Sequence, residues 1–253
     1  MFIAKLGEAV TDTSIPQAMG FIESLIADAA DGAYLDFSDL TRMWQDSAGT
    51  ASVVADANPV GKISSRYGSG SAIQITAGQF GLYKNPPAPG IWRGDGSNDW
   101  MDVQGFSFGG GVGNTMSMKI TPNAASAGRS FMGFSGANRF SIGLSASGFL
   151  LTSAGSGGAS SVTGTVDVRS QTVVVTATHD EDTIYLYRNA TLVGAAALAG
   201  SVATGVGPGL GAVKAGAAPP SGGWTGCDIY KALMLGGRSM TADEVAELVD
   251  AWA

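Results

Sequence analysis

The residues best suited to acid–base chemistry in this sequence are one histidine and the acidic residues that follow it. His179 is the only histidine, and Asp180, Glu181 and Asp182 come directly after it. A histidine beside a carboxylate can serve as a general base. These four polar residues follow a run of β-branched residues, so we place them in a hairpin turn. We predict a solvated His179, with a catalytic base as the alternative.

The glutamates are too few and too scattered for glycoside hydrolysis, which requires two carboxylates that face one cleft. There are five, with two in the N-terminal region, one in the expected turn and two near the C-terminus: Glu8, Glu23, Glu181, Glu244 and Glu247. No expected strand carries acidic residues at alternate positions, the spacing that points side chains to one face. We therefore expect no enzymatic activity.

Aromatic and acidic side chains lie close together between positions 92 and 102. Trp92 and Trp100 flank Asp95 and Asp99. Such a set could present rings and carboxylates to a glycan, and Asp95, Asp99 and Asp102 could bind calcium. The alternatives are that the tryptophans lie in the core and that the aspartates stabilise a turn. We favour these alternatives, and we expect no metal and no cofactor.

Composition and charge exclude several classes of partner. The net charge of −7 makes nucleic acid an unsuitable partner, because that binding needs clustered Lys and Arg. No basic amphipathic run or long apolar stretch predicts membrane binding. Lys5 and Glu8 follow the first apolar residues, so we expect no signal peptide. The single cysteine, Cys227, excludes an intrachain disulfide and is expected to be a buried thiol. These features are typical of a protein made in a reducing cytoplasm.

The strand pattern predicts an all-β protein. Residues 171–197 read as three antiparallel strands joined by two tight turns. Thr172–Thr178 is rich in β-branched residues, and Asn189 tolerates the left-handed backbone of a tight turn. Ile184–Tyr187 alternates aliphatic and aromatic residues, so both faces of that strand should be covered. From residue 91 onward, expected strands recur at roughly 8–12-residue spacing, which is typical of a sandwich or barrel.

Residues 1–32 predict an N-terminal helix that begins near Ser14 and ends at Asp31-Gly32. Its apolar stripe includes four residues at helical spacing: Met19, Ile22, Leu25 and Ile26. This stripe could pack on the helix's own domain, or it could form a docking arm for another subunit.

The segment that follows, residues 33–90, is turn-rich, and its best strand candidates are Ala33–Phe37, Ala51–Val54, Val60–Ser64 and Ala72–Ile75. A second short helix is expected at the C-terminal end, where Thr241 and Glu244 can form a capping box.

Three stretches resemble, in order, a laminin G-like or concanavalin A-like jelly-roll domain. They are residues 92–103, the three-strand segment 171–197, and residues 224–249. The resemblance covers about residues 91–253. It implies an antiparallel jelly-roll β-sandwich with a short N-terminal helix and a short C-terminal helix. Glucanases of this class carry a Glu-x-Asp-x-Glu strand, and this sequence has none.

A further resemblance lies upstream. Residues 35–50 and 58–63 look like a segment of tailed-bacteriophage structural proteins. This resemblance implies a virion component of a tail, fibre or head decoration, made in the host cytoplasm and assembled through contacts with other virion proteins. Low charge and many small residues suit close packing between copies, so we expect a homo-oligomer. The alternative function is a carbohydrate-binding module for a host-surface glycan, at Trp92, Asp95, Asp99 and Trp100. A polysaccharide hydrolase is a third and weaker hypothesis.

Overall fold

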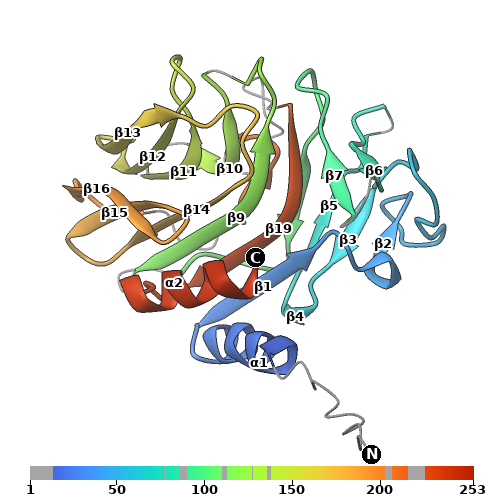
Figure 1. Ribbon diagram of the computed structural model, residues 1–253, viewed down its shortest axis with the longest axis horizontal. Helices are drawn as coiled ribbons and strands as arrows, with labels where there is room; N and C mark the ends of the chain where they lie inside the picture. Colours follow the sequence, from blue (N-terminus) through green and yellow to red (C-terminus); the bar gives the residue numbers. More distant parts are fainter. Residues whose placement is uncertain are drawn as a thin grey trace, which may run out of the picture.

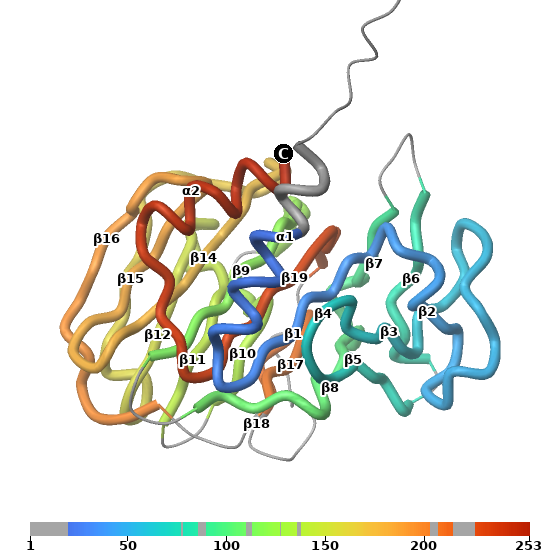
Figure 2. The backbone as a smooth tube through the Cα atoms, turned by 90° about the horizontal axis from the view of Figure 1, so that it is seen from below, coloured from blue at the N-terminus to red at the C-terminus, as the bar shows by residue number. Residues whose placement is uncertain are grey.

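The computed structural model describes residues 14–76, 78–85, 90–109, 113–126, 128–135, 138–202, 207–215 and 226–253. In this part of the chain two β-sheets stack face to face, and two helices cover the outer face of one of them (Figure 1). The view from below shows the helices α1 and α2 as a third layer beside β9, β19 and β1 (Figure 2). The predicted all-β sandwich with a short helix near each end is confirmed.

Nine strands of the described residues form the first sheet. In spatial order they are β16 (Thr191–Ala197), β15 (Thr183–Arg188), β14 (Val173–His179), β9 (Asn114–Pro122), β19 (Cys227–Gly236), β1 (Asp31–Asp36) and β4 (Tyr67–Gly68), with β7 (Ile91–Arg93) and β6 (Leu82–Lys84) joined beside β19. The helices on its outer face are α1 (Ser14–Ala27) and α2 (Ala242–Ala251). No helix among the described residues is both long enough and apolar enough to cross a membrane.

Ten strands of the described residues form the second sheet. In spatial order they are β13 (Ser160–Asp167), β12 (Phe149–Ser156), β11 (Asn138–Leu144), β10 (Ser130–Ser135), β17 (Gly209–Leu210), β8 (Met101–Gln104), β5 (Ser71–Ile73), β3 (Lys62–Ser64) and β2 (Met43–Trp44), with β18 (Lys214–Ala215) parallel to β10. A short 3-10 helix, η1 (Leu40–Arg42), precedes β2.

The three-strand segment predicted at residues 171–197 is confirmed as β14, β15 and β16. Asn189 in the second turn has φ 53°, the left-handed conformation that a tight hairpin turn needs. The backbone N–H of Asn189 donates to the Val174 carbonyl oxygen, and the side-chain oxygen of Asn189 accepts from the Val174 backbone N–H. Ile184 and Leu186 are fully buried between the sheets, so the alternation of Ile184–Tyr187 decides the register of this hairpin.

A second core lies between the helices and the outer face of the nine-stranded sheet. Ile22 and Leu25 of α1 are each 1% exposed, and they belong to one cluster with Leu233 of β19 and with Tyr34 and Trp252. The rings of Tyr34 and Trp252 stack with centroids 6.2 Å apart. The helical layer therefore buries apolar surface of its own chain.

This packing corrects the prediction of a docking arm. Two of the four stripe residues, Ile22 and Leu25, are used inside the chain, and Ile26 is partly buried beside them. The side chain of Met19 lies outside the described residues. Of the two alternatives that the sequence left open, the structure supports packing on the helix's own domain. The helix also ends at Ala27, earlier than predicted, because Asp31-Gly32 begins β1.

The segment 33–90 does not stand apart from the sandwich. Strand β1 pairs with β19 over six residues, from Asp31↔Gly236 to Asp36↔Lys231, inside the first sheet. Strands β3 and β5 belong to the second sheet. The predicted strand Ala51–Val54 is reduced to one isolated bridge at Ser52. The segment limits expected at residues 32 and 90 therefore do not divide the chain into separate structural units. Long-range strand pairing joins the residues near both limits to the C-terminal strand β19.

The predicted capping box of the C-terminal helix is confirmed. Thr241 accepts a hydrogen bond from the Glu244 N–H at 3.2 Å, and the Thr241 N–H donates to the Glu244 carboxylate at 2.8 Å. We expect Thr241→Ala to lower the free energy of unfolding by about 1 kcal/mol, because the first turn loses a side-chain acceptor. Urea unfolding measures this. Thr241→Ser keeps the acceptor and should stay near wild type; an equal loss in both variants would contradict the capping role.

Candidate functional site

The tryptophans considered for a glycan surface are buried. Trp92 on β7 is fully buried in the core between the sheets, and Trp100 is 7% exposed. A ring enclosed by the core has no free face for a sugar. The structure therefore supports the alternative that the two tryptophans are buried. It corrects the hypothesis of a glycan-binding surface at Trp92 and Trp100.

The nearby aspartates are held by donors of the chain. Asp99 is 6% exposed and accepts the Asp95 N–H at 2.8 Å, and Asp95 in turn accepts the Ser97 N–H at 2.7 Å. Burial raises the pKa of Asp99. Asp102 pairs with Lys214 at 2.6 Å. Among the described residues no three His, Cys, Asp or Glu side chains form a group suited to a metal ion. The arrangement is that of a hydrogen-bonded turn.

The prediction of a solvated His179 is wrong. This residue ends β14, is 3% exposed and faces the Phe140 ring edge-on, with centroids 5.0 Å apart. Its Nε2 lies 3.0 Å from the Asn114 amide nitrogen, and its Nδ1 lies 2.9 Å from the Asp180 carbonyl oxygen. The acidic turn begins one residue later, so the histidine points into the core while Glu181 is exposed.

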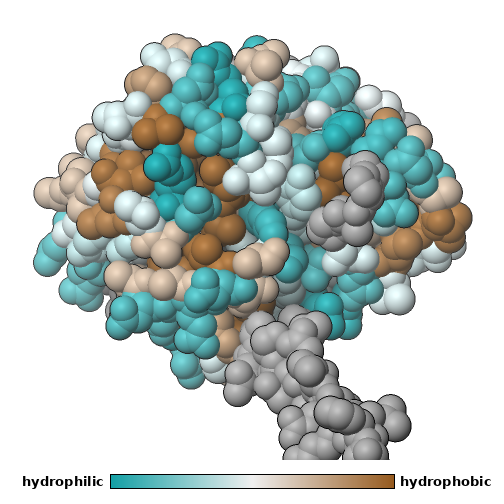
Figure 3. All heavy atoms as spheres, viewed as in Figure 1, coloured by the Kyte–Doolittle hydropathy of each residue, from teal (hydrophilic) through white to brown (hydrophobic). Residues whose placement is uncertain are grey.

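A polar surface remains where the helices leave the nine-stranded sheet uncovered. We call this part the open face and define it by Arg93 on β7, Asp228 and Tyr230 on β19, Thr121 on β9, and Thr172 just before β14. The hydroxyl of Thr121 lies 2.7 Å from that of Thr172 and 3.2 Å from that of Tyr230. In Figure 3, which shows the sheet from this side, hydrophilic residues lie among pale and hydrophobic ones on the face above α2.

A hollow opens at one end of the open face. It has a volume of about 380 Å³ and is lined by Arg93, Gly94, Thr121, Pro122, Asn123, Ala124, Ser170, Cys227 and Asp228. We call it the polar hollow. The side chain of Cys227 is buried, as predicted, and burial raises the pKa of its thiol. The hollow therefore does not provide a reactive thiolate.

A bidentate ion pair spans the hollow's lining. Arg93 and Asp228 are register partners on β7 and β19. Their contacts are Nε–Oδ1 at 2.6 Å and Nη2–Oδ2 at 2.7 Å. Donation of these hydrogen bonds to the Asp228 carboxylate raises the pKa of Arg93. The Arg93 side chain is 47% exposed, so the pair is fixed in geometry yet open to solvent.

The hollow also contains an amide with a free donor. Asn123 uses its side-chain oxygen to accept from the Ala125 N–H at 3.0 Å and from the Ser126 hydroxyl at 2.8 Å. Its amide nitrogen has no hydrogen-bond partner among the described residues. The hollow thus combines a carboxylate acceptor, guanidinium and amide donors, and the hydroxyl of Thr121, which can both donate and accept. This set can bind a neutral polyhydroxyl ligand.

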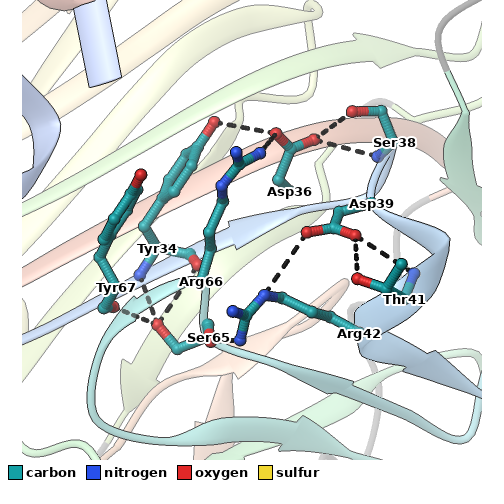
Figure 4. A network of polar contacts seen from close by, with 9 residues as sticks. All are labelled: Tyr34, Asp36, Ser38, Asp39, Thr41, Arg42, Ser65, Arg66 and Tyr67. Carbon is teal, nitrogen blue, oxygen red and sulfur yellow. Dashed lines mark hydrogen bonds and ion pairs between the residues drawn. The ribbon is translucent and has the colours of Figure 1, made fainter. Parts of the chain in front are cut away.

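A network of polar contacts adjoins the open face at β1 (Figure 4). Asp36 accepts from the Ser38 hydroxyl at 2.6 Å and from the Tyr34 hydroxyl at 3.3 Å, and it lies 3.7 Å from Arg66. Burial, and after it the charge of Asp36, raise the pKa of Tyr34. The carboxylate of Asp36 is therefore fully engaged by groups of its own chain.

A second hollow, of about 200 Å³, lies between β13 and β16 and includes the exposed apolar residues Val166 and Leu192. It offers fewer hydrogen-bonding side chains than the polar hollow. The acidic turn at Asp180–Thr183 forms a third and shallow depression. Neither combines donors and acceptors as the polar hollow does, so we take the polar hollow as the candidate site.

The residues of the polar hollow were not identified from the sequence as a site. None of Arg93, Thr121, Asn123 and Asp228 belongs to the site residues that the sequence predicted. Arg93 and Asp228 lie 135 positions apart and meet only because β7 pairs with β19. No local spacing signals such a pair.

Two stacked, mostly antiparallel sheets are the architecture of a jelly-roll domain. Residues 95–246 match the family model described as the concanavalin A-like lectin/glucanases superfamily, which is more than half of the chain. The chain belongs to this superfamily, as the resemblance of residues 91–253 implied.

Solved structures of low sequence identity share the fold. The binding domain of Paraclostridial Mosquitocidal Protein 1 is 11% identical with a TM-score of 0.54, and the match covers 72% of this chain and 51% of that one. A botulinum neurotoxin type C structure is 11% identical with a TM-score of 0.50, covering 91% and 53%. The chain thus spans about half the length of these structures. No curated protein sequence matches it.

Proposed function

We propose that this chain is a carbohydrate-binding module whose polar hollow holds a glycan without chemical conversion. The observation that carries the proposal is the solvent-open, bidentate Arg93–Asp228 pair beside the free amide donor of Asn123 and the hydroxyl of Thr121. Sugar hydroxyls both donate and accept hydrogen bonds. They need fixed carboxylate, guanidinium and amide partners in a concave setting, which this hollow provides.

Binding by this hollow requires little rearrangement. Asp228 is oriented by Arg93, and each carboxylate oxygen keeps a lone pair for a ligand hydroxyl. Tyr230, held through its hydroxyl by Thr121, lies on the same face and supplies an amphipathic ring. Preorganised partners lower the entropy cost of association. We expect a single glycan to be held through hydroxyl contacts, with affinity set by these few polar side chains.

Two comparisons support this proposal. The superfamily to which the chain belongs includes lectins by its description. The botulinum neurotoxin type C protein, which has a similar fold, depends for cell entry on interaction with two ganglioside molecules, and gangliosides carry sugars. That dependence belongs to the neurotoxin, and its extension to this chain is our proposal.

The proposal is tested with Asp228→Asn, which keeps the shape of the side chain and removes its charge. A glycan array first identifies ligands of the wild type, and calorimetry then measures affinity. We expect Asp228→Asn to weaken binding at least about tenfold, since hydrogen bonds to a charged group contribute about 1.5–3 kcal/mol.

The matched control is Asp102→Asn. Asp102 is 20% exposed and paired with Lys214, whereas Asp228 is 18% exposed and paired with Arg93, so the two changes are similar but lie on different sheets. Asp102→Asn should bind as wild type. A wild type that binds no glycan, with or without calcium, would contradict the proposed function, and equal binding by Asp228→Asn would exclude the polar hollow.

The role as a virion structural protein and homo-oligomer stays a prediction. It rests on the resemblance of residues 35–50 and 58–63, and the buried side chains of α1 remove one argument for it. A glycan-binding module can also be part of a virion, so the two hypotheses are compatible. Light scattering that shows a monomer under all conditions would count against the homo-oligomer.

A further inference from the structure

Two lysines lie directly opposite each other on the outer face of the nine-stranded sheet. Lys119 of β9 and Lys231 of β19 are register partners. Like charges directly opposite each other on neighbouring strands are destabilising. Both side chains are half-buried, so water screens their repulsion incompletely. A pairing of this kind needs a reason beyond the stability of the sheet.

The chain itself leaves one of the two ammonium groups without a partner. Lys119 donates to the main-chain oxygens of Trp252 and Ala253, the latter at 3.2 Å. Lys231 has no hydrogen bond and no ion pair within 4 Å in the described part of the chain. Burial lowers the pKa of Lys231, and the charges of Lys119 and Arg66 lower it further. An unpaired, half-buried cation is the kind of group that an anion stabilises.

The nearest carboxylate does not fill this role. Asp36 is the register partner of Lys231 on β1, and its charge favours the ammonium form of that lysine. Its oxygens, however, are engaged by Ser38, Tyr34 and Arg66, as Figure 4 shows for these residues. The row Lys119, Lys231 and Asp36 across β9, β19 and β1, with Arg66 paired to Asp36, therefore contains three cationic side chains and one carboxylate that is already engaged. This local excess of positive charge occurs on a chain whose net charge is −7.

The cationic group adjoins the polar hollow. Thr121, which lines the hollow, lies two residues beyond Lys119 on the same face of β9, about 7 Å along the strand. On β19, Asp228 and Lys231 are separated by the bulge at Tyr230, whose hydroxyl contacts Thr121. A ligand held in the hollow can therefore extend over Tyr230 to Lys231.

We propose that Lys231, with Lys119 and Arg66 beside it, binds the anionic group of a glycan whose neutral hydroxyls occupy the polar hollow. The ligand class is an acidic oligosaccharide that carries a carboxylate or a sulfate. This proposal rests on the proposed function of the hollow and names its ligand class. Charge complementarity supplies the specificity, because a neutral glycan leaves the cationic group without a counterion.

The test uses an array that contains neutral, carboxylated and sulfated glycans, followed by calorimetry on the best acidic ligand and its neutral parent. We expect the wild type to bind the acidic glycan at least about tenfold more tightly. Raising the salt concentration should reduce this preference. The carboxylated and sulfated arms distinguish the two sources of the anion.

Three variants separate this inference from the proposed function. Lys231→Gln should remove the acidic preference and keep neutral binding, whereas Asp228→Asn should weaken both. Lys231→Arg should retain the preference. The control Lys62→Gln removes a half-buried lysine from the other sheet and should bind as wild type. Lys231→Gln should also unfold no more easily than wild type, because it removes the repulsion by Lys119.

Each outcome decides a different statement. A wild type that binds only neutral glycans overturns the anionic subsite and leaves the hollow's function intact. An acidic preference that survives Lys231→Gln places the anion elsewhere and overturns the inference as well. A wild type that binds no glycan at all overturns the proposed function, and the inference with it.

Discussion

Replacing Trp252 with alanine is expected to lower the free energy of unfolding by about 3–5 kcal/mol. Trp252 follows α2, is 1% exposed, and stacks on Tyr34 of β1 in the cluster that also contains Ile22 and Leu25 of α1. Its removal leaves a cavity where both helices meet the outer face of the sheet. Because close-packed interiors relax only partly, the cavity adds to the lost burial.

Trp252→Phe is the matched control. The indole Nε1 of Trp252 is buried and has no hydrogen-bond partner among the described residues. Phenylalanine therefore loses volume but leaves no polar group unpaired, and we expect a loss of less than about 1.5 kcal/mol. Urea unfolding followed by circular dichroism measures both variants. A loss below 1 kcal/mol in Trp252→Ala would mean that the helical layer unfolds separately from the sandwich.

Local patterns in the sequence predicted many of the strands and the capping box of α2. The β-branched run Thr172–Thr178 predicted β14, and Thr241 with Glu244 predicted the start of α2. Each depends on residues near one another in the chain, where backbone preferences act directly. The alternation along β14 also contained a signal for His179, because Val173, Val175 and Ala177 share its face and all are buried. The acidic residues that follow hid this signal.

Long-range pairing could not be predicted from those patterns. Strand β1 lies between β19 and β4, and its partner β19 is about 200 residues away in the chain. The Arg93–Asp228 pair and the Lys119–Lys231 pair both arise from the strands that neighbour β19. Whether Trp92 points into the core or out of it likewise depends on which sheet β7 joins. The composition of a strand does not decide its neighbours, so the candidate site followed only from the fold.

His179 is expected to make the protein less stable as the pH falls below about 6.5. The Gly237 N–H donates to the Asn114 side-chain oxygen at 3.0 Å, which orients the Asn114 amide nitrogen toward Nε2 of His179. Nε2 must then accept, and Nδ1–H donates to the Asp180 carbonyl oxygen. The neutral ring satisfies both contacts. Protonation would place two donors against each other at Nε2.

The sign of the pH dependence follows from the direction of the pKa shift. Burial lowers the pKa of His179, and the contacts with Asp180 oppose this shift only in part. Below about pH 6.5 the unfolded chain therefore binds a proton that the folded chain does not. Stability is lost as the pH falls, by at most about 1.4 kcal/mol per pH unit, until the folded-state pKa is reached. Between pH 7 and 5 this amounts to about 2 kcal/mol at most.

His179→Gln isolates this contribution, because glutamine stays neutral over the whole range. Its unfolding free energy should depend less steeply on pH between 7 and 5 than that of the wild type, although the variant is less stable at pH 7 after losing the ring packed on Phe140. His179 is the only histidine in the sequence, so an untagged protein gives one imidazole NMR titration curve, with its midpoint below 6.5. A midpoint at or above 6.5, or equal slopes in the two proteins, would show that the ring is solvated, as the sequence first indicated.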